Sequence, residues 1–93
     1  MSALRIWITG RVQGVGFRFY TARAARDHGI VGRVRNRADG RVEIEAAGEP
    51  ESLAAFIAEL RRGPRGSWVE AVTQEPYDGA PAWKHFEIDR SSS

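Results

Sequence analysis

A chain of 93 residues, of which 42% are hydrophobic, has room for one compact domain, which we expect to span residues 1–93. It contains no cysteine, which excludes disulfides, iron–sulfur clusters, thiolate zinc sites and cysteine nucleophiles. The formal net charge is only +2, but residues 1–41 hold nine arginines against two aspartates, a balance of +7, and residues 42–93 balance to −5, so the first half should attract anions.

The sequence also bears on location. No stretch approaches the roughly 20 apolar residues of a membrane span, and residues 1–20 lack the apolar run and cleavage site of a signal peptide. We therefore expect a soluble, unprocessed, cytoplasmic protein that makes no contact with membranes. The apolar positions form no long patch, which favours a monomer.

The first half of the chain predicts strand, helix and hairpin in that order. Residues 4–9 (LRIWIT) alternate with the period of a half-buried strand. Apolar side chains then recur at helical spacing from Phe17 to His28, and Gly29 follows as a cap, which predicts a helix of about three turns. The β-rich stretches IVGRVRN and VEIEA flank Ala38-Asp39-Gly40 and predict a hairpin.

The second half predicts a further helix and strand. Pro50 suits a first helical position, Gly63 and Pro64 suit a helix end, and the apolar residues between them have helical spacing. SWVEAVTQE (67–75) reads as the fourth strand, and KHFEID (84–89) as a short additional edge strand, with residues 89–93 as a frayed tail. The order βαββαβ predicts an α+β fold, the ferredoxin-like split βαβ sandwich, with an antiparallel sheet and two helices on one face.

This topology makes the first two long strands parallel, so they end at the same edge of the sheet, beside the start of the first helix. The loop GRVQGVGFRF (10–19) leaves the first strand there, and Asn36 ends the second. Asn36 shares the parity of Val34, so it should point toward the helices if Val34 does. We therefore expect Arg18 and Asn36 to face one small pocket.

The glycine loop is suited to binding an anion. Gly14 and Gly16 can adopt positive φ and aim successive N–H groups inward as a nest. The helix N-terminus adds unpaired donors, and the fork of Arg18 suits two phosphate oxygens. A Walker loop would need a lysine that is absent, and a dinucleotide fingerprint would need a glycine at Phe19. On spacing alone, a simple tight turn between strand and helix explains the glycines equally well.

The motif GRVQGVGFR, followed by GRVRNRADGRVEIEAAG, resembles the acylphosphatases over nearly the whole chain. The resemblance implies hydrolysis of small acyl phosphates to carboxylate and inorganic phosphate, without metal or cofactor. It implies that Arg18 is the essential arginine and Asn36 positions the attacking water. The phosphate-binding backbone would be that of Gln13, Gly14, Val15, Gly16 and Phe17, together with Arg18.

The family usually has an aromatic residue at the position of Arg33. Since Arg33 and Asn36 fall on opposite strand faces, we expect this difference to alter the surface or the stability rather than the activity.

Other polar residues have structural explanations. His28 lies near a helix end and His85 near an edge strand, and no metal-ligand spacing links them. Glu43 and Glu45 alternate on one strand face, which we expect to face solvent, so a hydrolase with paired carboxylates is disfavoured.

Two alternatives remain open. The arginine-rich first half would suit a nucleic-acid-binding module, although the third strand carries acids where stacking aromatics would be expected, so no nucleic-acid partner is expected. A non-catalytic anion sensor would keep the loop but hydrolyse nothing.

Overall fold

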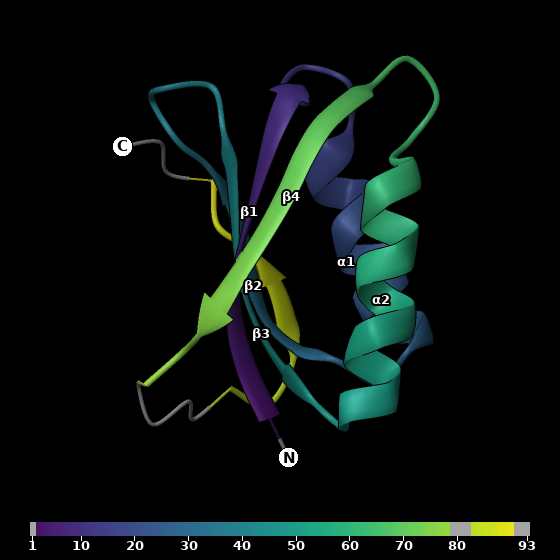
Figure 1. Ribbon diagram of the computed structural model, residues 1–93, viewed down its shortest axis with the longest axis vertical. Helices are drawn as coiled ribbons and strands as arrows, with labels where there is room; N and C mark the ends of the chain where they lie inside the picture. Colours follow the sequence, from purple (N-terminus) through teal and green to yellow (C-terminus); the bar gives the residue numbers. More distant parts are fainter. Residues whose placement is uncertain (1, 79–82, 91–93) are drawn as a thin grey trace.

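The computed structural model describes residues 2–78 and 83–90. Its elements follow the predicted order, including the short edge strand expected near the end of the chain. They are β1 (Ser2–Arg11), α1 (Phe17–Asp27), β2 (Val31–Asn36), β3 (Val42–Gly48), α2 (Pro50–Arg62), β4 (Trp68–Pro76) and β5 (Phe86–Ile88). Both helices lie side by side on one face of a single twisted sheet, as the α+β prediction required (Figure 1). No helix in this described part of the chain is long and apolar enough to cross a membrane.

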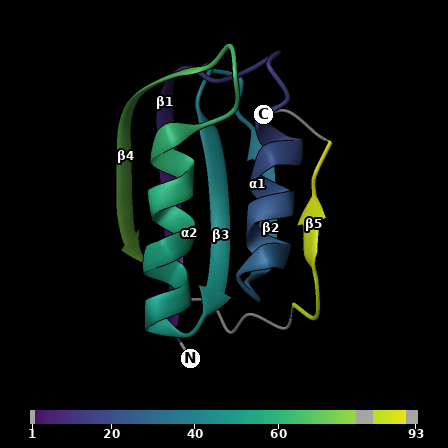
Figure 2. The same ribbon diagram turned by 90° about the vertical axis from the view of Figure 1, so that its right-hand side faces the viewer.

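The strand order in the sheet is β4-β1-β3-β2-β5. β3 pairs antiparallel with both β1 and β2, and β1 pairs antiparallel with β4, so the four long strands form the predicted antiparallel sheet. The short predicted edge strand is β5, which lies parallel to β2 and makes the five-stranded sheet mixed (Figure 2). Because β1 and β2 share an antiparallel neighbour, they run parallel and end at the same edge, as predicted.

The core lies between the sheet and the two helices. Even-numbered side chains of β1, β2 and β3 point toward the helices, in keeping with the period of two in a strand. α2 contributes the apolar face that its spacing predicted. The largest fully buried side chains are Phe17, Phe56, Ile6, Ile8, Ile44, Leu60, Val12, Val34, Val42 and Thr21.

The proline and glycine residues that the sequence predicted as helix limits lie at the ends of the helices. α1 closes at its C-terminus with hydrogen bonds from Gly29 N to Arg26 O and from Ile30 N to Ala25 O, the Schellman pattern, which confirms Gly29 as the cap. α2 begins at Pro50 and is followed by Gly63. Of the predicted tail, residues 89–90 follow β5 and residues 91–93 lie outside the described part of the chain.

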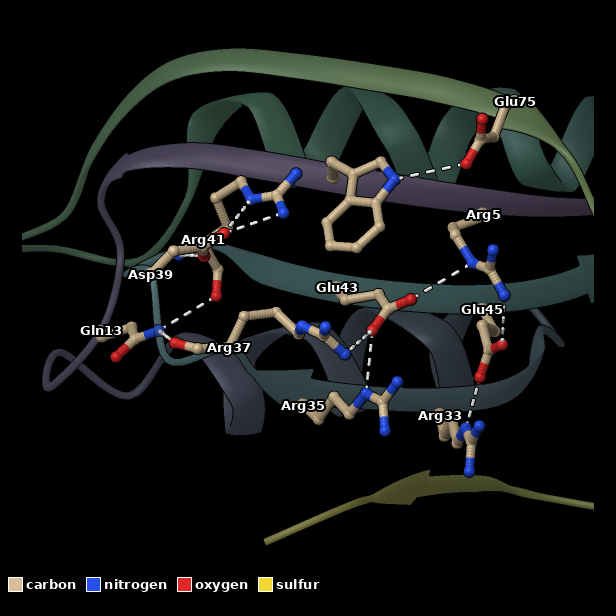
Figure 3. A network of polar contacts seen from close by, with 11 residues as sticks. Arg5, Gln13, Arg33, Arg35, Arg37, Asp39, Arg41, Glu43, Glu45 and Glu75 are labelled. Carbon is tan, nitrogen blue, oxygen red and sulfur yellow. Dashed lines mark hydrogen bonds and ion pairs between the residues drawn. The ribbon is translucent and has the colours of Figure 1, made fainter. Parts of the chain in front are cut away.

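The face of the sheet opposite the helices differs from the prediction. Glu43 and Glu45 were expected to face solvent, but they are only 4% and 3% exposed. Figure 3 shows why: arginines from the neighbouring strands reach over both carboxylates. Two carboxylates on the central strand are therefore covered and neutralised by guanidinium groups instead of being hydrated.

Glu43 is held by three arginines. Its Oε1 accepts hydrogen bonds from Arg35 Nε at 2.8 Å and Arg37 Nη1 at 3.2 Å, and its Oε2 lies 3.2 Å from Arg5 Nε. Trp7, on the adjacent strand, lies under the guanidinium of Arg41, whose Cζ is 4.0 Å from the ring centroid. The open face is thus a layer of charged and aromatic groups that contact one another.

Glu45 is paired with Arg33 and with Arg5, whose Nη2 donates a hydrogen bond at 3.1 Å. Burial alone would raise the pKa of Glu45, but the hydrogen bonds from Arg33 and Arg5 outweigh it and hold the pKa below its usual value. The same hydrogen bonds raise the pKa of both arginines. Glu45 is therefore an ionised group whose charge the fold stabilises.

Candidate active site

The loop between β1 and α1 turns the chain through two left-handed glycines. Gly14 has φ +76° and Gly16 has φ +78°, a region that residues with a side chain rarely adopt. Gly16 is also the residue before α1, and its carbonyl oxygen accepts the hydrogen bond of Tyr20 N at 3.0 Å. The predicted glycine loop therefore leads directly into the helix N-terminus.

The backbone amides of residues 13–19 point to no acceptor in the part of the chain that the structure describes. Within the described residues, none of them donates a hydrogen bond to a backbone or side-chain oxygen, and α1 has no side-chain cap. No acidic side chain lies in the first turn of α1 to neutralise these donors. A run of unsatisfied donors at a helix N-terminus is an environment that favours a bound anion.

Gln13 braces this loop from the side. Its Nε2 donates hydrogen bonds to the carbonyl oxygens of Arg37 at 2.8 Å and Arg41 at 3.0 Å, which belong to the β2–β3 turn (Figure 3). The loop after β1 is thus tied to the chain immediately beyond Asn36. This contact joins the two segments that topology predicted to meet.

A cavity of about 110 Å³ lies where the segments meet. Arg18 and Asn36 both line it, although 17 residues separate them in the sequence, as predicted. Its full lining is Val12, Gly14, Gly16, Phe17, Arg18, Phe19 and Asn36. The cavity is smaller than the usual pocket for a drug-sized ligand, and it suits a group about as large as a phosphoryl group.

Neither Arg18 nor Asn36, the two polar side chains at the cavity, is paired with another of the described residues. Oδ1 of Asn36 is buried and accepts no hydrogen bond within the described chain. No acidic group among residues 2–78 and 83–90 lies within ion-pair distance of the Arg18 guanidinium. Since a buried acceptor without a partner costs free energy, Oδ1 of Asn36 is better explained by a ligand or water than by the fold, and the partly exposed guanidinium of Arg18 is available to the same ligand.

Of the six residues predicted to bind phosphate, the cavity is lined by Gly14, Gly16, Phe17 and Arg18. Gln13 and Val15, for which the prediction concerned the backbone, are not among its lining residues: the side chain of Gln13 braces the loop and that of Val15 packs against the core. Val12 and Phe19 line it and were not predicted. Phe19 follows Arg18 in the first turn of α1, so adjacency in the sequence was the available signal. Val12 is buried, and nothing in its local pattern marked it.

The remaining polar candidates lie elsewhere. His28 follows α1, and its Nε2 lies 3.5 Å from Oε1 of Glu59 on α2. Asp39 accepts hydrogen bonds from the backbone and side chain of Arg41 and so closes the predicted β2–β3 turn. Across the described ranges, no group of three His, Asp or Glu side chains could hold a metal ion.

Comparison with known proteins gives one consistent result. The acylphosphatase family model matches residues 4–88. An acylphosphatase of Koribacter versatilis is 52% identical over 87 residues, which cover 91% of this chain and 77% of that protein. One from Actinobacillus pleuropneumoniae is 45% identical over 83 residues, covering 89% and 92%.

Solved structures agree with the sequence comparison. The crystal structure of an acylphosphatase from Bacillus subtilis superimposes with a TM-score of 0.92 at 36% identity, covering 96% of this chain and 99% of that one. It has the same ferredoxin-like architecture, so fold and sequence point to the same relatives. The chain therefore belongs to the acylphosphatase family of hydrolases.

Proposed function

We propose that the cavity is the active site of this acylphosphatase, that it needs no metal, and that it hydrolyses the carboxyl–phosphate bond of small acyl phosphates to carboxylate and inorganic phosphate. The observation that carries the proposal is the convergence of Arg18, Asn36 and the glycine loop on one small cavity. Arg18 and the backbone of residues 13–17 bind the phosphoryl group. Asn36 positions the water.

The leaving group explains why so few catalytic side chains suffice. A departing carboxylate has a conjugate acid with a pKa of about 4, so no general acid is needed to protonate it. Phosphoryl transfer passes through a loose transition state in most analyses, with weak bonding to the nucleophile, so a strong base is also unnecessary. What remains for the protein is to hold the phosphoryl group and to place one water in line with the breaking bond.

The loop and Arg18 fit the first task. The amides of residues 13–19 are available as donors, and the N-terminus of α1 adds a partial positive charge. Arg18 has no competing carboxylate in the described chain, so its planar fork is available to two phosphoryl oxygens. Because charge sits on these oxygens in the transition state, donors fixed in advance lower the barrier.

Asn36 fits the second task. Its buried Oδ1 can accept a hydrogen bond from water, and the NH₂ group of the same amide can donate one to a phosphoryl oxygen. Asn36 is the last residue of β2 and is paired with Val42 of β3, so the sheet fixes the backbone from which the amide extends. A water bound to Oδ1 would then face the phosphoryl group from the side of the sheet.

The test is turnover of benzoyl phosphate in the presence of excess chelator. We expect wild-type activity to survive, and Arg18→Ala and Asn36→Ala each to lose about 10²–10³ in kcat, as for removal of one oriented donor from a preorganised site. Arg18→Ala should also weaken inhibition by inorganic phosphate, whereas Asn36→Ala should retain it. The matched control is Arg23→Ala, an exposed arginine of α1 that does not line the cavity.

Loss of wild-type activity with the chelator, or full activity in both cavity variants, would contradict this mechanism. Phosphate binding without any hydrolysis would instead identify an anion sensor. Turnover that Arg18→Ala and Arg23→Ala reduce equally would show that overall charge, and not the cavity, governs the reaction.

The proposed partner is a small molecule, and we infer that the chain acts as a monomer. The arginines of the open face are paired with Glu43, Glu45 and Asp39, which leaves them less available to a nucleic-acid backbone. Only two large apolar side chains of the described part are largely exposed, Phe19 and Trp68, which favours a monomer. Location in the cytoplasm stays a prediction.

A further inference from the structure

Phe19 lies at the rim of the cavity and is unusually exposed for its size. Its side chain is 59% accessible, yet it lines the cavity next to Arg18. The guanidinium of Arg90 lies over its ring, with Cζ 5.9 Å from the centroid. A flat apolar surface and a second cation therefore adjoin the proposed phosphoryl site.

The pairing of β5 explains how Arg90 reaches this place. β5 runs parallel to β2 along the edge of the sheet, toward the end at which α1 begins (Figure 2). Val34 is level with Ile88, and Asp89 N donates to Val34 O at 2.8 Å beyond the last strand residue. Extending this register by two residues puts Arg90 level with Asn36.

The alternation of side chains along a strand indicates on which face of the sheet Arg90 lies. Phe86 and Ile88 pack against the core, so Arg90 shares the face of the helices and the cavity. By the same alternation Asp89 falls on the opposite face. Arg33 lies on that face, and its pKa is raised first by its hydrogen bond with Glu45 and further by the negative charge of Asp89.

From this geometry, and on the basis of the function proposed above, we propose that Phe19 and Arg90 form the acyl subsite and favour acyl phosphates that carry a second anionic group on the acyl chain. With the phosphoryl group at Arg18, the acyl chain leaves the cavity over the Phe19 ring. A carboxylate further along that chain reaches the guanidinium of Arg90. Neither residue takes part in the chemical step, so both determine specificity.

The test uses pairs of rigid substrates that differ in charge and hardly in shape. These are 4-carboxybenzoyl and 4-carbamoylbenzoyl phosphate, together with the 3-substituted pair, and benzoyl phosphate as the reference. For at least one pair, we expect wild-type kcat/KM to be about threefold to fivefold higher for the carboxylate, the range of an exposed ion pair. The preference should shrink as salt is raised, because an exposed pair is screened.

Substitutions test whether Arg90 and Phe19 cause the preference for the carboxylated substrates. Arg90→Gln should abolish it and should change kcat/KM less for benzoyl phosphate, which carries no carboxylate for the guanidinium to bind, than for the carboxylated substrates; Arg90→Lys should restore part of the preference. Arg61→Gln, the matched loss of one positive charge at the exposed end of α2, should keep it. Phe19→Ala should raise KM for all the benzoyl substrates, because they lose the ring on which they rest.

Equal kcat/KM within both substrate pairs, or a preference that survives Arg90→Gln, would overturn the acyl subsite while leaving benzoyl phosphate hydrolysis intact. A preference lost equally in Arg61→Gln would overturn it too, since it would then reflect the net charge of the protein. Failure of the wild type to hydrolyse benzoyl phosphate would overturn both this inference and the function on which it rests.

Discussion

Nε2 of Gln13 lies 2.8 Å from the carbonyl oxygen of Arg37, so the glycine loop is attached to the residue that follows Asn36. The same nitrogen donates to Arg41 O at 3.0 Å. These bonds connect the segment proposed to hold phosphate with the strand end proposed to hold water. The distance between the phosphate-binding loop and Asn36 therefore depends on the side chain of Gln13, which does not itself line the cavity.

We predict that Gln13→Ala lowers kcat/KM for benzoyl phosphate about tenfold, since a small misplacement of a binding loop is costly to a reaction that depends on position. The free energy of unfolding should fall by only about 1 kcal/mol, the net value of such hydrogen bonds. Steady-state kinetics and urea denaturation measure the two effects. Gln74→Ala, at an exposed position of β4, is the control. Unchanged kinetics in Gln13→Ala would show that the loop holds its shape without the brace.

Gly16 allows a second prediction, because the cost of its left-handed backbone can be measured separately from the cost of a steric clash. A Cβ at Gly16 would meet no atom of the described chain within 4 Å beyond its two sequence neighbours, so the φ of +78° is the obstacle to an alanine at this position. We predict that Gly16→Ala lowers the free energy of unfolding by about 1–2 kcal/mol, the cost of a left-handed residue with a side chain. Gly16→Asn should cost less, because asparagine tolerates this region. Equal losses in urea denaturation would contradict the backbone explanation.

Local signals were sufficient for the parts of the fold that depend on local chemistry. Pro50 and Gly63 mark the limits of α2, and Gly29 ends α1. The meeting of Arg18 and Asn36 followed from topology and strand parity, because two parallel strands must end at one edge. These inferences needed only the order of elements and the direction of alternate side chains.

The burial of Glu45 could not be inferred in that way. Alternation assigns it to the open face, but it does not show that Arg5 and Arg33, from both neighbouring strands, extend over it. The approach of Arg90 to Phe19 likewise depends on the parallel pairing of β5, which has no local signal. Such contacts between long side chains of distant segments require the assembled sheet.

The Glu45 cluster predicts a specific dependence of stability on pH. The folded pKa of Glu45 lies below the ordinary value of 4.5, so its contribution is fully present above pH 4.5 and is lost as the pH falls through the lower folded value. We predict that Glu45→Gln lowers the free energy of unfolding at pH 7 by about 1–3 kcal/mol, less than for a fully buried pair because the arginines are partly exposed. Between pH 6 and pH 3, urea denaturation should show the difference from wild type shrinking. A difference constant over this range would mean that shape, and not charge, explains the loss.

Arg33 provides a test of whether changes on the open face of the sheet, opposite the helices, affect catalysis at the cavity. It pairs with Glu45 on the face opposite Asn36, at a position where the family resemblance implies an aromatic residue. We predict that Arg33→Trp changes kcat/KM for benzoyl phosphate by less than about twofold, because Arg33 is bonded to Glu45 on the other face of the sheet and does not line the cavity.

The free energy of unfolding in Arg33→Trp should fall by no more than about 1 kcal/mol, since Arg5 still neutralises Glu45 and the indole can cover it. A double-mutant cycle with Glu45→Gln isolates the Arg33–Glu45 coupling, which should account for most of the change. A tenfold loss of kcat/KM with unchanged stability would contradict this separation. It would mean that β2 transmits the replacement from one face of the sheet to Asn36 on the other.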